Sequence, residues 1–180
     1  MSDVFYYFAY GSNLLKKRLF ASSKSAEFVC VAKLNQYSLA FAKIGEGECA
    51  WHGAVATITQ NIDDCVYGVV WKCNIEELPI LTKQETHYNR INLEVQEVDS
   101  ENCFNVTTYM IPDDPVGSLN IALPSPHYLN VILKGAKECN LPVDYIEKLE
   151  KLSHNGYRGK VKICNFDYEK EISGDDAFFV

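Results

Sequence analysis

The opening of the chain constrains the fold most, because three kinds of local chemistry follow one another there. Residues 4–7 are aromatic or β-branched, which favours a β-strand. Gly11, Ser12 and Asn13 are turn residues, since glycine permits positive φ and the other two bond the backbone locally. Residues 14–20 read as a helix that is apolar on one side and basic on the other, with Ser12 or Asn13 as the N-cap. The sequence therefore predicts a strand, a tight turn and a helix N-terminus.

This turn has two interpretations. Free backbone N–H groups converge at a helix N-terminus, where they suit a carboxylate or a developing oxyanion. Many strand-to-helix connections that contain glycine and serine are, however, plain turns, and a short motif is a hypothesis until its structural context is known. Local chemistry alone leaves both interpretations open.

The length of the chain indicates one domain. We expect a single domain over residues 1–180, which is long enough to bury a sizeable core without disulfides or a metal. The segment after about residue 160 is charged, and we expect it to be loosely held.

Composition excludes several classes of protein. The net charge of -7 and the pI of about 5.1 argue against nucleic-acid binding, which needs basic patches. No apolar run approaches the roughly 20 residues that cross a membrane, and the N-terminus lacks the basic region of a signal peptide. The seven cysteines are scattered without a CxxC pair, so neither a disulfide framework nor a zinc ribbon is expected. Reduced cysteines predict a cytoplasmic protein.

Hydrophobic patterns predict an α+β fold. Strands are expected at residues 30–34, 37–42, 51–58, 66–73, 88–95 and 106–111, with turns at 35–36 and 61–64. Residues 121–126 contain two prolines and are expected to be extended, whereas 127–138 and 143–152 are predicted helices. Many short strands followed by two helices favour a curled, mainly antiparallel sheet.

Glu85 is the most unusual acidic residue of the sequence. A helix is predicted to begin after Asn74 as N-cap, and Leu78, Leu81 and Glu85 then share one face of it. A carboxylate on an apolar face is costly to bury unless it is paired. Glu85 is therefore either a functional carboxyl group or a structural one that is ion-paired with Arg90 or Lys83.

An ordered set of motifs resembles the γ-glutamylcyclotransferase family. The set consists of residues 7–14 (YFAYGSNL), 51–53 (WHG), 56–58 (ATI), 68–72 (GVVWK), 84–85 (QE), 124–126 (PSP) with Tyr128, 135–138 (GAKE), 141–142 (LP) and 157–161 (YRGKV). One such motif would be weak evidence. Together they extend in register from about Val4 to Val161, which makes the resemblance specific.

The resemblance implies a fold, an activity and a set of site residues. The fold would be a small mixed, mainly antiparallel β-barrel flanked by helices. The activity would be the cyclisation of a γ-glutamyl amino acid to 5-oxoproline with release of the free amino acid, without cofactor or metal. Glu85 would be the proton shuttle, and the substrate-binding residues would be Tyr7, Phe8, Ala9, Tyr10, Gly11, Ser12, Asn13 and Tyr128.

The chemistry of the residues agrees with that implication. One carboxyl group can take a proton from the attacking amine and return it to the leaving amine if its pKa lies near neutrality, and partial burial raises the pKa of a carboxyl group. N–H groups of residues 10–13 would hold the negative charge on the γ-oxygen. Tyr88, Arg90 and Tyr109 are further pocket candidates, Arg90 either binding a substrate carboxylate or pairing with Glu85 or Glu94.

The sequence departs from the family just after the glutamate. Thr86 stands where the family commonly has glycine, and the connection from Glu85 to the next strand looks shorter than in the vertebrate enzymes. Two alternatives therefore remain: a relative specific for glutathione or γ-glutamyl amines, and a catalytically silent binding or regulatory protein. A homodimer and the preferred acceptor amino acid are left open by the sequence.

Overall fold

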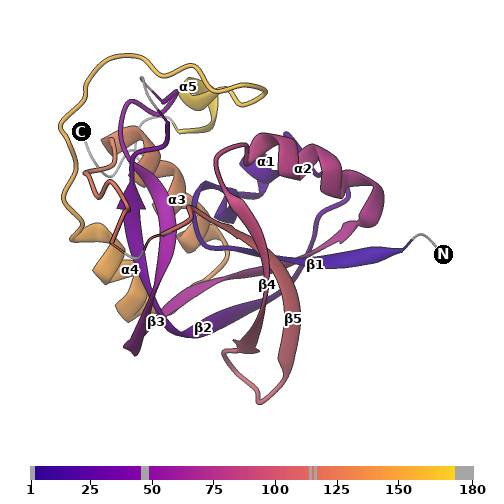
Figure 1. The fold of residues 1–180 in the computed structure, drawn as a ribbon. Helices are drawn as coiled ribbons and strands as arrows, with labels where there is room; N and C mark the ends of the chain where they lie inside the picture. The colour runs from indigo at the N-terminus through magenta and orange to yellow at the C-terminus, as the bar shows by residue number, and fades with distance from the viewer. Residues whose placement is uncertain (1–2, 46–48, 114, 116, 173–180) are drawn as a thin grey trace.

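A closed β-barrel organises the molecule. The computed structural model describes residues 3–45, 49–113, 115 and 117–172. Its strands are β1 (Val4–Ala9), β2 (Glu27–Ala42), β3 (Val55–Asn74), β4 (Asn89–Glu97) and β5 (Cys103–Met110), which close in the order β1-β3-β2-β4-β5 (Figure 1). Neighbouring strands are antiparallel except β1 and β5, which meet in parallel at Tyr7 and Thr107. The expected α+β fold with a mixed, mainly antiparallel barrel is confirmed.

Two expected turns are wrong. Turns between strands were predicted at residues 35–36 and 61–64. Residues 35–36 instead lie inside β2 and residues 61–64 inside β3, and these two strands pair along most of their length. Gln36 adopts a positive φ of 65° at an irregularity of the register between Asn35 and Tyr37. Turn-forming residues thus produce a bulge, because a bulge bends and twists a long strand without ending it. The strand predicted at 51–58 begins only at Val55, after a turn.

Helices cover one end and one side of the barrel. They are η1 (Ser12–Leu14), α1 (Lys16–Leu19), η2 (Ile75–Glu77), α2 (Leu78–Gln84), α3 (Pro126–Glu138), α4 (Val143–Glu150) and α5 (Tyr168–Glu171). Figure 1 shows α1 and α2 together over one end of the barrel, and α3 and α4 together beside β3. Ser125 caps α3 by accepting a hydrogen bond from the Tyr128 N–H at 3.2 Å, so the predicted helix at 127–138 is confirmed with a conventional N-cap.

Helix α3 holds the opening turn against the barrel through a close backbone approach. A Cβ atom on Gly135 would lie 2.4 Å from the backbone nitrogen of Leu15 and 2.6 Å from the carbonyl carbon of Leu14. Both leucines are fully buried. Only glycine fits at this crossing, and the contact fixes the turn that precedes Leu14.

The segment after residue 160 is not loose as far as the structure describes it. Val161, Phe166, Tyr168 and Ile172 are buried, so residues 161–172 pack on the rest of the molecule. The expectation of a loosely held tail overlooked these apolar residues, whose burial offsets the charge around them. Residues 173–180 lie outside the described part.

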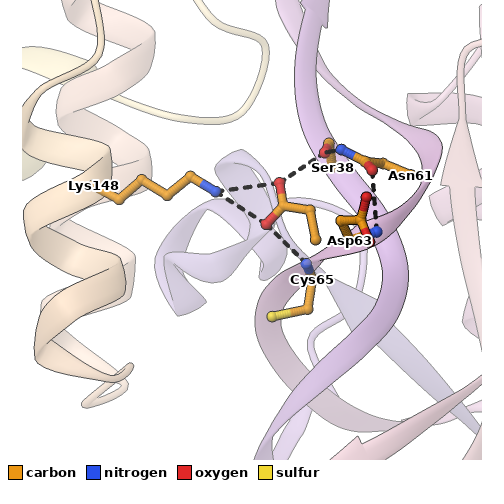
Figure 2. Close-up of polar contacts among 6 residues, drawn as sticks. Ser38, Asn61, Asp63, Cys65 and Lys148 are labelled. Carbon is orange, nitrogen blue, oxygen red and sulfur yellow. Dashed lines mark hydrogen bonds and ion pairs between the residues drawn. The ribbon is translucent and has the colours of Figure 1, made fainter.

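A polar network ties the middle of β3 to α4. The Asp64 carboxylate accepts hydrogen bonds from the Ser38 hydroxyl at 2.7 Å and from the Cys65 N–H at 2.9 Å, and it pairs with Lys148 at 3.2 Å (Figure 2). Asn61 donates to the Ser38 hydroxyl at 2.9 Å. Part of the predicted turn at 61–64 therefore serves as a docking point for a helix.

Candidate active site

The opening turn is built differently from the predicted helix N-terminus. Ser12–Leu14 forms a single 3-10 turn, Leu15 is extended, and α1 begins only at Lys16. Neither helix has a side-chain N-cap, so the expected capping role of Ser12 or Asn13 is wrong. Among the described residues no hydrogen bond takes up the N–H groups of Gly11, Ser12 and Asn13, while the next two N–H groups bond back to Gly11 and Ser12. The turn therefore retains donors that a ligand can use.

The side chain of Asn13 points across the barrel end instead of capping a helix. Its Nδ2 donates to the Tyr7 hydroxyl at 3.0 Å and to Oε1 of Glu85 at 3.1 Å. Asn13 is buried. Buried amides are strongly directed by their partners, so this side chain links the turn to the glutamate that lies 72 residues further along the chain.

Glu85 lies at the C-terminal end of α2. Its N–H closes the helix on the Leu81 carbonyl at 3.2 Å, and Leu81 is fully buried, so the residue is held close to the core. Burial raises the pKa of the Glu85 carboxyl group, while hydrogen bonds from Gln84 and Asn13 and the charge of Arg18 oppose that rise. The half-buried carboxyl group thus has the environment expected of a group that both takes and returns a proton.

Tyrosines on the barrel wall face this carboxyl group. The Tyr10 hydroxyl donates to the Tyr109 carbonyl, and the Tyr109 hydroxyl shares a hydrogen bond of 2.7 Å with Thr82. Burial raises the pKa of Tyr7, Tyr10 and Tyr109. These phenols therefore stay protonated at neutral pH, as neutral hydrogen-bonding groups.

Two more tyrosines close the other wall. Ala56 donates its N–H to the Tyr128 hydroxyl at 3.1 Å, and its carbonyl accepts from the Tyr88 hydroxyl at 2.9 Å. Tyr128 packs against Trp51 with ring centroids 5.1 Å apart, and burial raises its pKa to about 12. Both phenols are thereby fixed by the backbone of β3, in front of the opening turn.

These residues line a small chamber. It has a volume of about 30 Å³ and is lined by Tyr7, Tyr10, Gly11, Ser12, Asn13, Ala56, Glu85, Tyr88, Tyr109 and Tyr128. Ser12, Glu85, Tyr88 and Tyr128 also line an adjacent groove of about 790 Å³. The combined cavity has a polar inner end and a roomy outer part, which suits a small ligand with an extended substituent.

The structure brings most of the predicted site residues together. Tyr7, Tyr10, Gly11, Ser12, Asn13, Glu85 and Tyr128 line the chamber, as do the further candidates Tyr88 and Tyr109. Phe8 and Ala9 do not: both are buried in the core, and Phe8 lies on the strand face opposite to that of Tyr7. Arg90 is an exposed residue of β4 that lines neither cavity.

The proposed structural ion pair of Glu85 is not formed. In the described residues neither Arg90 nor Lys83 makes a salt bridge to it, and its hydrogen-bond donors are amides. The interpretation of Glu85 as a merely ion-paired glutamate is therefore wrong for this arrangement.

Sequence reasoning missed Arg18 and Gln84. Arg18 lines the outer groove, is only 8% exposed, and donates from Nη1 to Oε1 of Gln84 at 2.9 Å. In the sequence it stands beside Lys16 and Lys17 and looked like the third cation of a solvated helix face. In the single turn of α1, Arg18 instead points inward. No local sequence pattern predicts its burial.

The described residues contain neither a metal-binding cluster nor a membrane-spanning helix. Within them no group of three or more His, Cys, Asp and Glu side chains is arranged to bind a metal ion. No helix in the same part of the chain is both long and apolar enough to cross a membrane.

The chain is similar to known proteins in both sequence and structure. Residues 65–149 match the model of the AIG2-like family. The chain is 40% identical to the gamma-glutamylcyclotransferase of Homo sapiens and 38% identical to that of Mus musculus, in each case over 163 residues, 88% of this chain and 84% of the relative. A solved structure of a gamma-glutamyl cyclotransferase superposes with a TM-score of 0.83 at 39% identity, covering 89% of this chain and 94% of that one.

Proposed function

The chain belongs to the γ-glutamylcyclotransferase family, and from that premise we propose that it converts γ-glutamyl amino acids into 5-oxoproline and the free amino acid. The observation that carries the proposal is the meeting of Glu85 with the opening turn: Asn13 of that turn donates to the Glu85 carboxyl group at 3.1 Å, at the wall of the chamber.

Glu85 acts as both base and acid in one turnover. The α-ammonium of the glutamyl group gives a proton to the Glu85 carboxylate, and the amine nitrogen then bonds to the γ-carbonyl carbon. The bond from that carbon to the acceptor nitrogen breaks as the leaving nitrogen takes that proton back from Glu85. The new ring nitrogen sheds a second proton, which passes through Glu85 to the released amine, so the products are neutral lactam and an ammonium group. Atoms and charges balance without water or a co-reactant, and the carboxyl group ends as it began.

The opening turn stabilises the charge that develops during attack. Attack places negative charge on the γ-oxygen, and the N–H groups of Gly11, Ser12 and Asn13 are donors without acceptors among the described residues. The surrounding tyrosines exclude water and confine the glutamyl group, so that amine and carbonyl stay within reach of each other. The acceptor then lies in the outer groove, where there is room for its side chain.

The reducing interior of the cell is the proposed setting. All seven cysteines are free thiols in the structure, and Cys103 and Cys164 are exposed. Free exposed thiols persist in a reducing compartment, which supports a cytoplasmic location.

Release of 5-oxoproline tests the proposed function. The purified protein is incubated with γ-glutamyl-alanine, glutathione and a γ-glutamyl alkylamine, and 5-oxoproline is measured by mass spectrometry. We expect the highest kcat/KM with γ-glutamyl-alanine. Much faster turnover of glutathione or of the alkylamine would overturn the substrate assignment. If none of the three compounds gives 5-oxoproline, the chain is a binding or regulatory protein instead of an enzyme.

A further inference from the structure

Arg18 is a buried cation without a carboxylate partner. It lies in the single turn of α1, and its relative exposure is 8%. In the part of the chain that the structure describes it forms no salt bridge, and its Nε is buried without a hydrogen-bond partner. Burying an unpaired guanidinium is costly, so the position calls for a functional explanation.

The side-chain hydrogen bond that Arg18 makes within the described residues fixes the orientation of Gln84. Arg18 Nη1 lies 2.9 Å from Oε1 of Gln84. A guanidinium can only donate, so the oxygen of the Gln84 amide must face it, and the NH₂ group must face the other way. That NH₂ group lies 3.1 Å from Oε1 of Glu85 and 3.3 Å from Oδ1 of Asn13.

Gln84 in turn fixes the orientation of Asn13. Because Oδ1 of Asn13 accepts from Gln84, its Nδ2 is left to donate to Oε1 of Glu85 at 3.1 Å and to the Tyr7 hydroxyl at 3.0 Å. Reversal of either amide would place oxygen against oxygen. Arg18 thus decides which atoms of Gln84 and Asn13 donate and which accept.

The result is an asymmetric carboxyl group. Oε1 of Glu85 accepts two amide hydrogen bonds, whereas none of the described residues bonds to Oε2. An oxygen that already accepts two donors is a poor place for a proton, while the second oxygen of the same group stays available.

We propose that Arg18 is a positioning residue for the cyclisation: through Gln84 it orients the two amides that hold Oε1 of Glu85, and so directs proton transfer to Oε2. This inference deepens the proposed function and rests on it. Arg18 does not touch the reacting atoms in this scheme. Its missing counterion is explained, because its charge supports the carboxylate through Gln84 instead of being cancelled by a direct ion pair.

The other charged and titratable groups around Glu85 are mostly neutral phenols. Those that interact electrostatically with its carboxyl group are Tyr7 and Tyr10 from the opening segment, Tyr88 before β4, Tyr109 of β5, Tyr128 of α3, and Arg18 itself. Lys83 and His87 line the outer groove further along α2 and its connection. Among the described residues, Arg18 is therefore the cation whose charge lowers the pKa of Glu85, and its loss should raise that pKa.

The test compares four single variants and the double variant Arg18→Met/Gln84→Met with the wild-type protein. Arg18→Met removes the cation, Arg18→Lys keeps a donor and a charge, and Gln84→Met removes the intermediate amide. Lys17→Met is the matched control, because it removes one cation from the same turn at an exposed side chain whose partner is Glu171. Two readouts are used: the ¹³C chemical shift of the Glu85 carboxyl carbon against pH, assigned with Glu85→Gln, and the pH profile of kcat with γ-glutamyl-alanine.

The expected pattern separates positioning from substrate binding. Arg18→Met and Gln84→Met should move both the carboxyl titration and the acid limb of kcat to higher pH. They should lower kcat roughly 10- to 100-fold with little change in KM, as expected when a reacting group is misplaced. Arg18→Lys should recover part of the loss, Lys17→Met should behave as wild type, and the double variant should be no worse than Arg18→Met.

Other outcomes overturn the inference. If KM rises in Arg18→Met while the acid limb of kcat does not move, Arg18 binds a substrate carboxylate instead. If Gln84→Met behaves as wild type, Gln84 does not transmit an effect of Arg18 to Glu85. If Arg18→Met does not fold, the less buried Gln84→Met decides alone. A failure of the proposed function is recognised separately, because the wild-type protein would then release no 5-oxoproline. The titration of the Glu85 carboxyl group would still show whether Arg18 acts on it through Gln84.

Discussion

Two carboxyl groups in this molecule, Glu85 and Asp64, are held by hydrogen bonds and yet have opposite environments. Asp64 accepts from the Ser38 hydroxyl, a backbone N–H and the ammonium of Lys148, and these lower its pKa (Figure 2). Within the described residues Glu85 accepts from two amides, both on Oε1, and burial raises its pKa. The first group is satisfied on both oxygens. The second keeps an oxygen free beside a cavity.

The difference is the one expected between a structural carboxylate and the proposed proton shuttle. Asp64 joins β2 and β3 to α4, and its charge is neutralised by an ion pair, so it has no reason to exchange protons near neutral pH. Glu85 is close to Arg18 but is separated from it by Gln84, which stabilises the carboxylate without trapping it. A raised pKa together with a free oxygen at a cavity therefore supports the proposed role of Glu85 better than burial alone does.

Replacing each carboxyl group by its amide should break the comparison most clearly. Glu85→Gln should lower kcat for 5-oxoproline release roughly 10²- to 10⁴-fold, the usual contribution of a general acid–base group. Asp64→Asn should stay within about twofold of wild type, because it lies outside the cavity lining. Near-wild-type turnover of Glu85→Gln, with an unchanged circular dichroism spectrum, would remove Glu85 from the mechanism.

Removing one neutral donor from each carboxyl group should sharpen the contrast. Asn13→Ala deletes a hydrogen bond to Glu85, and Ser38→Ala deletes one to Asp64. Hydrogen bonds to charged groups contribute about 1.5–3 kcal/mol, so kcat should fall roughly 10- to 100-fold for Asn13→Ala. Ser38→Ala should leave kcat unchanged and lower the urea midpoint of unfolding. Equal effects of the two variants on kcat would contradict the distinction.

The two amide substitutions should also change stability in opposite directions. The pKa of Glu85 is raised on folding, so its carboxylate destabilises the native state as pH rises through and above that pKa, and Glu85→Gln should be more stable at pH 7. The pKa of Asp64 is lowered on folding, so its contribution is present above the unfolded pKa of about 3.9 and is lost as pH falls through the folded value.

The size of these stability changes should be roughly 0.5–2 kcal/mol in each case, a typical range for single substitutions. Thermal unfolding followed between pH 3 and pH 8 measures both variants against wild type. The gain of Glu85→Gln should shrink toward acidic pH, where Glu85 is protonated in both states. A loss of stability on Glu85→Gln at pH 7 would show that the carboxylate is structural after all.

The smallest expected effect concerns Lys148. Its ammonium lies 3.2 Å from Asp64, but its side chain is 55% exposed, so solvent weakens the ion pair. Lys148→Met should lower the free energy of unfolding by less than about 1 kcal/mol and leave kcat unchanged. The loss should become smaller in 0.5 M salt, whereas a salt-independent loss would indicate packing of the lysine stem rather than the charge.

Much of the fold could be predicted because its signals are local. The helix at α3 was predicted at 127–138 from its hydrophobic pattern, and the strand character of the barrel follows from runs of aromatic and β-branched residues. Pro126, which was expected to belong to the extended segment, is instead the first residue of α3, where a proline is tolerated. The positions of the turns at 35–36 and 61–64 could not be predicted in the same way. Turn-forming residues mark a bulge as readily as a chain reversal, and pairing between two long strands decided the outcome.

The sequence by itself determined which residue types were available for the chemistry: an opening turn of small and amide residues, a glutamate at the end of an apolar helix face, and several tyrosines. Only the tertiary structure decided that Asn13 faces Glu85 rather than capping a helix, that Phe8 and Ala9 pack into the core, and that Arg18 turns inward while its neighbours stay in solvent. The physical reason is that hydrogen-bond direction and burial depend on partners far away in sequence, which barrel closure brings together and local propensity does not encode.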